Sequence, residues 1–170
     1  TNFSFNMLAI QNGVPKILSL REILLAYIEH QKEVVTRRTA FDKEKAEARA
    51  HILAGLLIAL DHIDEVIRII RNSATDAEAQ AELMAKFELS ERQSQAILDM
   101  RLRRLTGLER DKIQSEYDEL IALIADLADI LAKPERVVAI IKEELDEVKR
   151  KYADDRRTEL MVGEVLSLED

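Results

Sequence analysis

The sequence predicts a mainly α fold: a long antiparallel two-helix coiled coil capped by a small globular helical head, with a short N-terminal β-hairpin at the foot. Three observations lead to this prediction. The 170 residues include only four glycines and two prolines, with 34% charged and 4% aromatic residues. Apolar residues recur at intervals of three and four over long stretches without helix breakers. Residue types that begin helices occur between these stretches.

Residues 1–18 predict the β-hairpin. Apolar Phe3 and Phe5 alternate with polar residues, and Asn12-Gly13 follows, a dipeptide that accepts the positive φ angles of a two-residue type I′ turn. Pro15 has no amide hydrogen, so the second strand is expected at an edge. Because a lone hairpin is marginally stable in water, we expect it to pack against other protein.

Residues 19–52 predict the outgoing helix of the coiled coil. Ser19 and Glu22 have the spacing of a capping box, and neither glycine nor proline occurs between Lys16 and Ala54. Steps of three and four give a seam in which apolar and polar positions alternate. This pattern favours a two-helix coiled coil with one side of the seam exposed to solvent. The predicted seam is Leu20, Leu24, Tyr27, Gln31, Val34, Arg38, Phe41, Lys45, Ala48 and Ile52.

Residues 53–108 predict the globular head. Apolar residues from Ile52 to Ile70 cover more than one face, which is typical of a helix surrounded by protein. Capping-box sequences that begin at Thr75 and Ser90 each predict a further short helix of roughly 10 to 15 residues.

Residues 109–153 predict the returning helix, and residues 154–170 a polar linker. A proline inside a helix removes a hydrogen bond, so Pro134 predicts a kink or break near Lys133. The apolar spacing keeps its phase across Pro134, and both segments are therefore expected to face the same partner. The predicted seam is Ile113, Tyr117, Leu120, Ile124, Leu127, Leu131, Val138, Ile141, Leu145, Val148 and Tyr152.

The composition argues against several kinds of chemistry. Without cysteine there is no disulfide framework and no thiolate site, and the isolated glycines form no phosphate-binding loop. A net charge of −8 disfavours indiscriminate duplex binding, and no long uncharged apolar run predicts a membrane span. The densest group of metal-ligand types, Asp61 to Glu65, places only His62 and Glu65 on one helical face. We expect no catalytic, cofactor-binding or metal-binding residue here, and a cytoplasmic location.

The segment from Gln95 to Leu105 predicts a contact between two copies of the chain. Its leucines have the i, i+4, i+7 spacing of one helical face, with arginines between them. A head of about 55 residues has a high surface-to-volume ratio, so surplus apolar side chains tend to seek a second copy. The alternative is that the stripe only fills the head's own core. The predicted dimer contact is Ile97, Leu98, Met100, Arg101, Leu102 and Leu105.

Several strings of the chain resemble the family of DNA gyrase A subunits, which belong to the type IIA DNA topoisomerases. They follow one another in the family's order over nearly the whole chain, and the run from Arg101 to Glu109 is the most specific. The strings are Val35-Thr36-Arg37-Arg38-Thr39, Ala50-His51-Ile52-Leu53, Ala59 to Glu65, Gln95 to Lys112, and Asp155-Arg156-Arg157-Thr158-Glu159.

The resemblance implies a coiled-coil arm and a head that forms the exit gate, or C-gate, where two subunits dimerise. The intact enzyme cleaves one DNA duplex, passes a second through the break in an ATP-dependent reaction, and so supercoils DNA. The implied partners are a second copy, the B subunit of DNA gyrase and the transported duplex. ATP and Mg²⁺ are expected to act elsewhere in the holoenzyme, in the bacterial cytoplasm near the nucleoid. Long arms permit hinging, and Pro134 and Gly55 are the expected hinge sites.

Three alternatives remain open at this point. A stand-alone coiled-coil scaffold fits the periodicity equally well. The equivalent region of topoisomerase IV has the same architecture, although its counterpart of the run from Gln95 to Lys112 usually differs. A helical metalloenzyme built on His62 and the acidic helices predicts one equivalent of bound metal.

Overall fold

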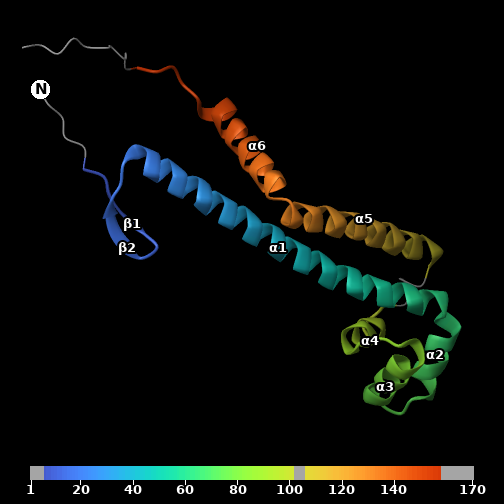
Figure 1. The fold of residues 1–170 in the computed structure, drawn as a ribbon. Helices are drawn as coiled ribbons and strands as arrows, with labels where there is room; N and C mark the ends of the chain where they lie inside the picture. The colour runs from blue at the N-terminus through green and yellow to red at the C-terminus, as the bar shows by residue number, and fades with distance from the viewer. Residues whose placement is uncertain (1–5, 102–105, 158–170) are drawn as a thin grey trace, which may run out of the picture.

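The computed structural model describes residues 6–101 and 106–157, which form a long arm with a helical head at one end and a hairpin at the other (Figure 1). The predicted fold class is confirmed. The elements are β1 (Leu8–Gln11), β2 (Val14–Ile17), α1 (Leu20–Asp61), α2 (Ile63–Asn72), α3 (Asp76–Phe87), α4 (Glu91–Leu98), α5 (Gly107–Ala132) and α6 (Pro134–Tyr152).

The hairpin has the predicted two-residue turn. Asn12 and Gly13 have φ angles of 53° and 79°, and β1 pairs antiparallel with β2 from Leu8 opposite Ile17 to Gln11 opposite Val14. Both Leu8 and Ile17 are largely exposed. The predicted strand residues Phe3 and Phe5 lie outside the described residues.

Helix α1 begins at the predicted capping box and continues into the head. The Ser19 amide donates to Glu22 Oε2 over 2.7 Å, and the Glu22 amide donates to Ser19 Oγ over 3.4 Å. The helix ends at Asp61, and α2 begins at Ile63, so the single helix expected from Ile52 to Ile70 is wrong. The turn at His62 lets the apolar residues on its two sides bury one another. These are Leu53, Leu56, Leu57 and Leu60 on α1 with Val66 and Ile69 on α2.

The predicted seam of α5 is confirmed, since none of its residues from Ile113 to Leu131 is exposed. The predicted seam of α1 is wrong by about one position, because Phe41 is 64% exposed and Ala48 is exposed. The distance between two helix axes depends on the side chains at the contact, and small ones permit close approach. Helix α1 therefore turns its small residues toward α5. Its buried arm residues are Val35, Thr39, Ala46, Ala50 and Leu53.

Two ion pairs join α1 to α5 along the arm. Arg49 donates to both carboxylate oxygens of Glu116 over 2.7 and 3.0 Å. This hydrogen bonding raises the pKa of Arg49. Nearer the head, Arg110 Nε donates to Asp61 Oδ1 over 2.9 Å. Both pairs are exposed and therefore add little stability, so the alignment of α1 and α5 depends mainly on packing along the seam.

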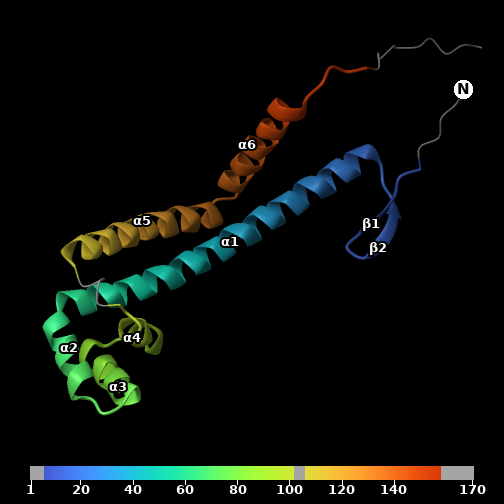
Figure 2. The same ribbon diagram turned by 180° about the vertical axis from the view of Figure 1, so that it is seen from behind.

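The head consists of the end of α1 with α2, α3 and α4 folded against it (Figure 2). The capping box predicted at Ser90 is complete. At Thr75 only the side-chain cap forms, since the carboxylate of Glu78 accepts instead from the amide of Ala74 over 2.9 Å. Leu83 and Leu89 from α3 and the following turn complete the buried cluster begun by α1 and α2.

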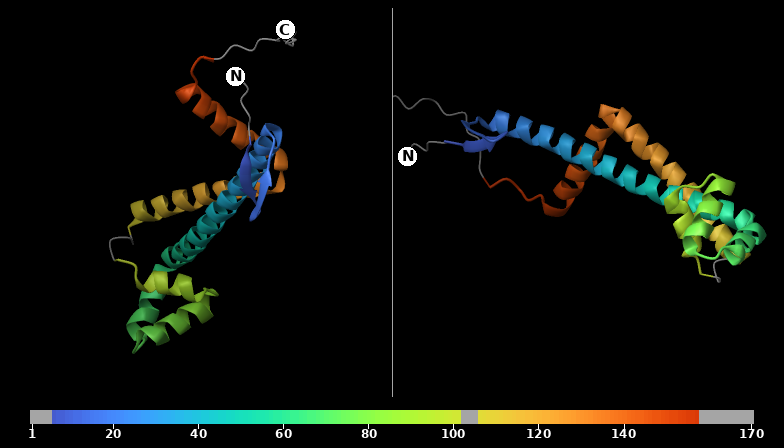
Figure 3. Two further views of the ribbon diagram at one scale, coloured as in Figure 1. Left: turned by 90° about the vertical axis from the view of Figure 1, so that its left-hand side faces the viewer. Right: turned by 90° about the horizontal axis from the view of Figure 1, so that it is seen from below.

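Helix α6 crosses α1 and then leaves it (Figure 3). Val137 and Ile141 are buried with Val35 of α1, but every residue from Lys142 to Tyr152 is exposed. The expectation that α6 would continue along the same partner is therefore wrong for its second half. The extended backbone at Lys133, with φ −123° and ψ 101°, redirects the helix axis.

Two substitutions in α1 distinguish the observed seam, which contains Ala50, from the seam predicted from sequence, which contains Ala48. Replacing buried Ala50 with Leu should lower the free energy of unfolding by about 1–3 kcal/mol, because the added methyl groups force α1 and α5 apart. Replacing Ala48 with Leu should change it by less than about 0.5 kcal/mol. Urea denaturation followed by circular dichroism measures both, and equal losses would contradict the observed seam.

Candidate dimer interface and hinges

The residues predicted to form the dimer contact surround the end of α4. Helix α4 ends at Leu98, and the amide of Asp99 donates to the carbonyls of Gln95 and Ile97. The helical stripe expected from Gln95 to Leu105 is thus interrupted, because the chain must turn here to bring α5 back along α1. Leu102 and Leu105 lie outside the described residues.

The described members of the predicted contact differ in exposure. Ile97 is 2% exposed and belongs to the core of the head. Leu98 and Met100 are half-buried and pack against that core, and Arg101 is exposed. Among the described members, only Leu98, Met100 and Arg101 have accessible surface, and Ile97 supports them from inside the head.

A shallow hollow of about 420 Å³ lies beside the end of α4. Its apolar lining includes Ile52 and Leu56 of α1 and Met100. The charged side chains of Arg49 and Arg101 also line it. Among the described residues of the head, three further large apolar side chains are exposed. They are Ile58 at 37%, Ile70 at 39% and Leu108 at 69%. The sequence pattern does not single out Leu108, because this residue falls at the boundary between the predicted head and the predicted returning helix.

A close contact between backbone and side chain fastens α4 to α1. A Cβ atom on Gly55 would lie 2.7 Å from Cβ and Cγ of Gln93, so only glycine fits there without a shift. Gln93 Nε2 donates to the carbonyl of His51 over 2.8 Å, and the ring nitrogen Nε2 of His51 lies 2.7 Å from Ser90 Oγ. The structure thus gives Gly55 a packing role, and its predicted role as a hinge stays a prediction.

The other predicted hinge is a break between two helices. Helix α5 ends at Ala132 and α6 begins at Pro134, where the missing amide hydrogen of proline is tolerated at the first helical position. Arg136 Nη1 donates to Asp126 Oδ1 over 2.8 Å and to Asp129 Oδ2 over 2.9 Å, which ties α6 to the last turns of α5. Lys133 Nζ lies 2.6 Å from Asp129 Oδ1. Lys133 and then Arg136 hold the pKa of Asp129 below its ordinary value.

The residues weighed for metal binding have other contacts. The His62 ring stacks on Phe87 with 5.5 Å between centroids, and Glu65 pairs with Lys86. Over residues 6–101 and 106–157, no group of three or more His, Cys, Asp or Glu side chains is placed to hold a metal ion. Within the same ranges, no helix combines the length and apolar content needed to cross a membrane.

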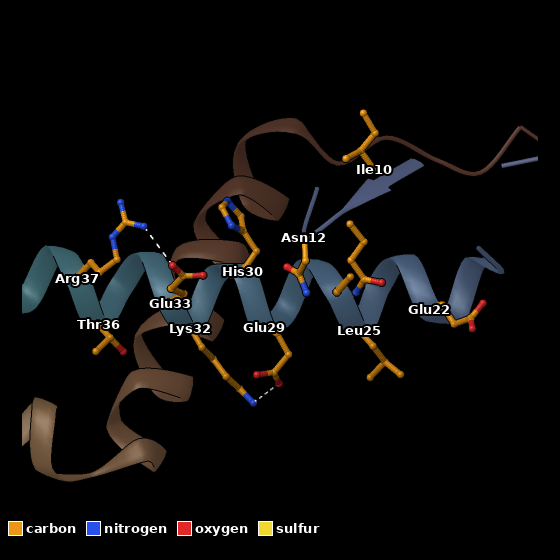
Figure 4. Close-up of a pocket in the computed structure, with 12 residues that line it drawn as sticks. Ile10, Asn12, Glu22, Leu25, Glu29, His30, Lys32, Glu33, Thr36 and Arg37 are labelled. Carbon is orange, nitrogen blue, oxygen red and sulfur yellow. Dashed lines mark hydrogen bonds and ion pairs between the residues drawn. The ribbon is translucent and has the colours of Figure 1, made fainter. Parts of the chain in front are cut away.

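A larger hollow of about 900 Å³ separates the hairpin from α1 (Figure 4). Two ion pairs on α1 occupy its charged side. Lys32 Nζ lies 2.7 Å from Glu29, and Arg37 Nη1 lies 3.1 Å from Glu33. Because these charges are paired along the helix, they do not converge on a common point as a reactive site requires.

Sequence comparison relates the chain to known proteins. Residues 1–146 match the family model described as the A subunit of DNA gyrase/topoisomerase IV. The chain is 88% identical over all 170 residues to the DNA gyrase A subunit of Streptococcus pneumoniae, 82% to that of Streptococcus pyogenes serotype M1 and 56% to that of Staphylococcus epidermidis. In each comparison the whole of this chain is covered, with 21%, 20% and 19% of the relative. The chain therefore spans about a fifth of the length of these curated relatives.

The contact at Gly55 predicts a stability loss on adding one methyl group. Gly55→Ala should lower the free energy of unfolding by about 1–2 kcal/mol, since overpacking against Gln93 outweighs the better helix propensity of alanine. Gly107→Ala is the matched control, because nothing lies within 4 Å of its added Cβ. It should leave stability unchanged or raise it by up to about 1 kcal/mol. A stabilised Gly55→Ala chain in urea denaturation would show that α4 does not approach α1 this closely.

The ion cluster at the break predicts a pH dependence. Because the pKa of Asp129 is depressed in the folded state, its contribution is present above its unfolded pKa and is lost as the pH falls through the folded value. Asp129→Asn should therefore lower stability at pH 7, and the difference from the unchanged chain should shrink below about pH 4. Urea denaturation across this range, with Glu119→Gln on the same helix as control, measures the effect. A difference that stays constant would contradict it.

Proposed function

The chain belongs to the family of A subunits of DNA gyrase and topoisomerase IV, and we propose that it is the arm and dimerisation head of the exit gate. In this proposal two copies meet through their heads and hold the enzyme together while its other contacts open. The transported duplex leaves when the heads part. The role of this chain is mechanical, and the chemistry of strand cleavage lies in other parts of the enzyme.

The observation that supports the proposal is the position of partly covered apolar surface at the tip of a long arm. Helix α1 has 42 residues, which corresponds to about 60 Å at 1.5 Å per residue. At its far end, Leu98 and Met100 pack only half-buried against the head, and Leu108 is largely exposed. An interface that must hold a cleaved complex needs about 800 Å² per partner with an apolar centre. If two copies meet at the tips of their arms, the space between the two arms can hold a DNA duplex.

A gate must also open, which requires that the arms bend without the heads unfolding. The break at Lys133 interrupts the helical hydrogen bonds between α5 and α6. Helix α1, which runs beside them, has no break at this level of the arm. Bending at this level leaves the core of the head intact, because that core is built from α1, α2, α3, α4 and the first turns of α5. We assign the Lys133–Pro134 break as the hinge of the proposed gate.

The activity of the intact enzyme is part of the proposal. It is ATP-dependent supercoiling of DNA by a type IIA topoisomerase, with the B subunit of DNA gyrase and duplex DNA as partners. ATP and Mg²⁺ are proposed to act outside this chain, since its described residues offer no cluster of metal ligands, and no step here runs through either group. Because the relatives are bacterial gyrase subunits, we place the protein in the bacterial cytoplasm with the nucleoid. High identity to gyrase subunits favours gyrase over topoisomerase IV and over a stand-alone scaffold.

Sedimentation equilibrium of the 170-residue chain tests the proposed gate. We expect a dimer at tens of micromolar, and Met100→Glu should weaken it by at least about tenfold, because an unpaired carboxylate would be buried in the contact. Leu98→Glu provides a second variant, and Leu123→Glu on the exposed side of α5 is the matched control. Circular dichroism checks that the arm stays helical. A helical monomer, or a dimer unaffected by both head variants, would contradict the proposed interface.

A further inference from the structure

Two apolar stripes face solvent near the foot of the arm. On α1, Leu20, Leu24 and Tyr27 are 63%, 54% and 47% exposed. On α6, Leu145, Val148 and Tyr152 are 43%, 53% and 76% exposed. Each stripe keeps the three-and-four spacing of a coiled-coil seam, so each has the pattern of a helix face that packs on another helix. A contiguous exposed apolar surface of this kind indicates an interaction site.

The two stripes fit each other in antiparallel register. In such a pair the residue numbers of facing positions have a constant sum, and core positions must meet in the same layers. One register brings all the exposed apolar residues of both stripes into shared layers. The facing pairs are Leu20 with Tyr152, Leu24 with Val148, Tyr27 with Leu145, Gln31 with Ile141 and Val34 with Val138.

This register lies beside a contact that already exists. Val35 of α1 is buried with Val137 and Ile141 of α6. The residue numbers of Val35 and Val137 have the same sum as those of the facing pairs, and both residues lie one position from the Val34–Val138 layer. Helix α6 has 19 residues, about 28 Å, which is long enough to reach the start of α1 from there. The break at Lys133 lies at the near end of α6 and supplies the pivot. Helix α6 is therefore tethered beside the surface that it fits, which gives it an advantage over any separate partner.

Ion pairs hold α6 in its crossed position. Arg38 Nη2 donates to Glu144 Oε1 over 2.6 Å, and these two residues do not face each other in the register of the stripes. Arg136 adds its contacts with Asp126 and Asp129 at the pivot. The Arg38–Glu144 pair is exposed, so it is a weak restraint that a modest force or a change of salt overcomes.

We propose that α6 is a strap with two positions. In the crossed position described above, the Arg38–Glu144 pair holds it at an angle to α1. In the closed position it pivots at Lys133, breaks that pair and packs antiparallel on residues 20–34 of α1, which extends the two-helix seam to the foot of the arm. The movement changes the direction in which the chain leaves the arm. This inference concerns one chain and does not depend on dimerisation through the head.

Disulfide trapping tests the closed position, and the chain suits it because it has no cysteine of its own. Leu24→Cys with Val148→Cys places two thiols in facing layers, and both side chains are exposed in the crossed position. Tyr27→Cys with Leu145→Cys tests the same register one layer away. The matched control is Glu29→Cys with Val148→Cys, since Glu29 lies on another face of α1. Oxidation of the 170-residue chain is followed by mass spectrometry and non-reducing electrophoresis.

We expect the two facing pairs to form intramolecular disulfides at least about tenfold faster than the control, at a rate independent of protein concentration. Glu144→Gln, which removes the ion pair with Arg38, should accelerate trapping of both pairs further. Equal rates for facing and control pairs would overturn the strap. A product that links two chains, at a rate that rises with concentration, would also overturn it and assign the stripes to a second copy.

Discussion

The close approach of α1 and α5 is the constraint on which the rest of the arm depends. It exists because α1 carries Ala46 and Ala50 at the positions that face α5, both of them buried. Small side chains bring the helix axes together, and dispersion contacts along the seam then compensate for the missing bulk. Because the face with the small residues packs on α5, the large residues on the other face of α1 are not covered by α5.

That choice explains why so much apolar surface is exposed in a chain with a well-formed core. Phe41 is turned away from α5, and the leucines nearest the hairpin have no helix over them, since α5 ends at Ala132 before reaching them. In the proposed strap, α6 covers this surface when it pivots. In the proposed gate, the exposed residues at the other end of the arm meet a second copy. The strap proposal follows from the departure of α6 from α1, and the gate proposal follows from the exposed apolar side chains at the head.

The head and the arm are joined without a flexible connection at α1. The helix passes from the arm into the head unbroken, and Gly55 lets α4 lie directly on it. Force applied to the head is therefore transmitted along the continuous helix α1. The break in the arm lies between α5 and α6, at Lys133. This division suits the proposed gate, because the proposed dimer contact is fixed to the continuous helix α1 while α5 and α6 adjust.

The sequence by itself determined most helix starts, the caps at Ser19 and Ser90, and the joint between α5 and α6. Ser19 and Ser90 begin their helices as predicted, the turn lies at Asn12-Gly13, and the break is at Lys133, because each depends on chemistry within a few residues. The seam of α5 was predictable because most of its large apolar residues recur at intervals of three and four along the helix. The seam of α1 was not, because large and small residues compete for the contact and only the fit to α5 decides between them. The end of α4 at Leu98, the buried position of Ile97 and the departure of α6 from α1 likewise depend on where distant helices lie. Local chemistry sets where most of these helices start, whereas packing between them decides where α1 and α4 stop and which faces are covered.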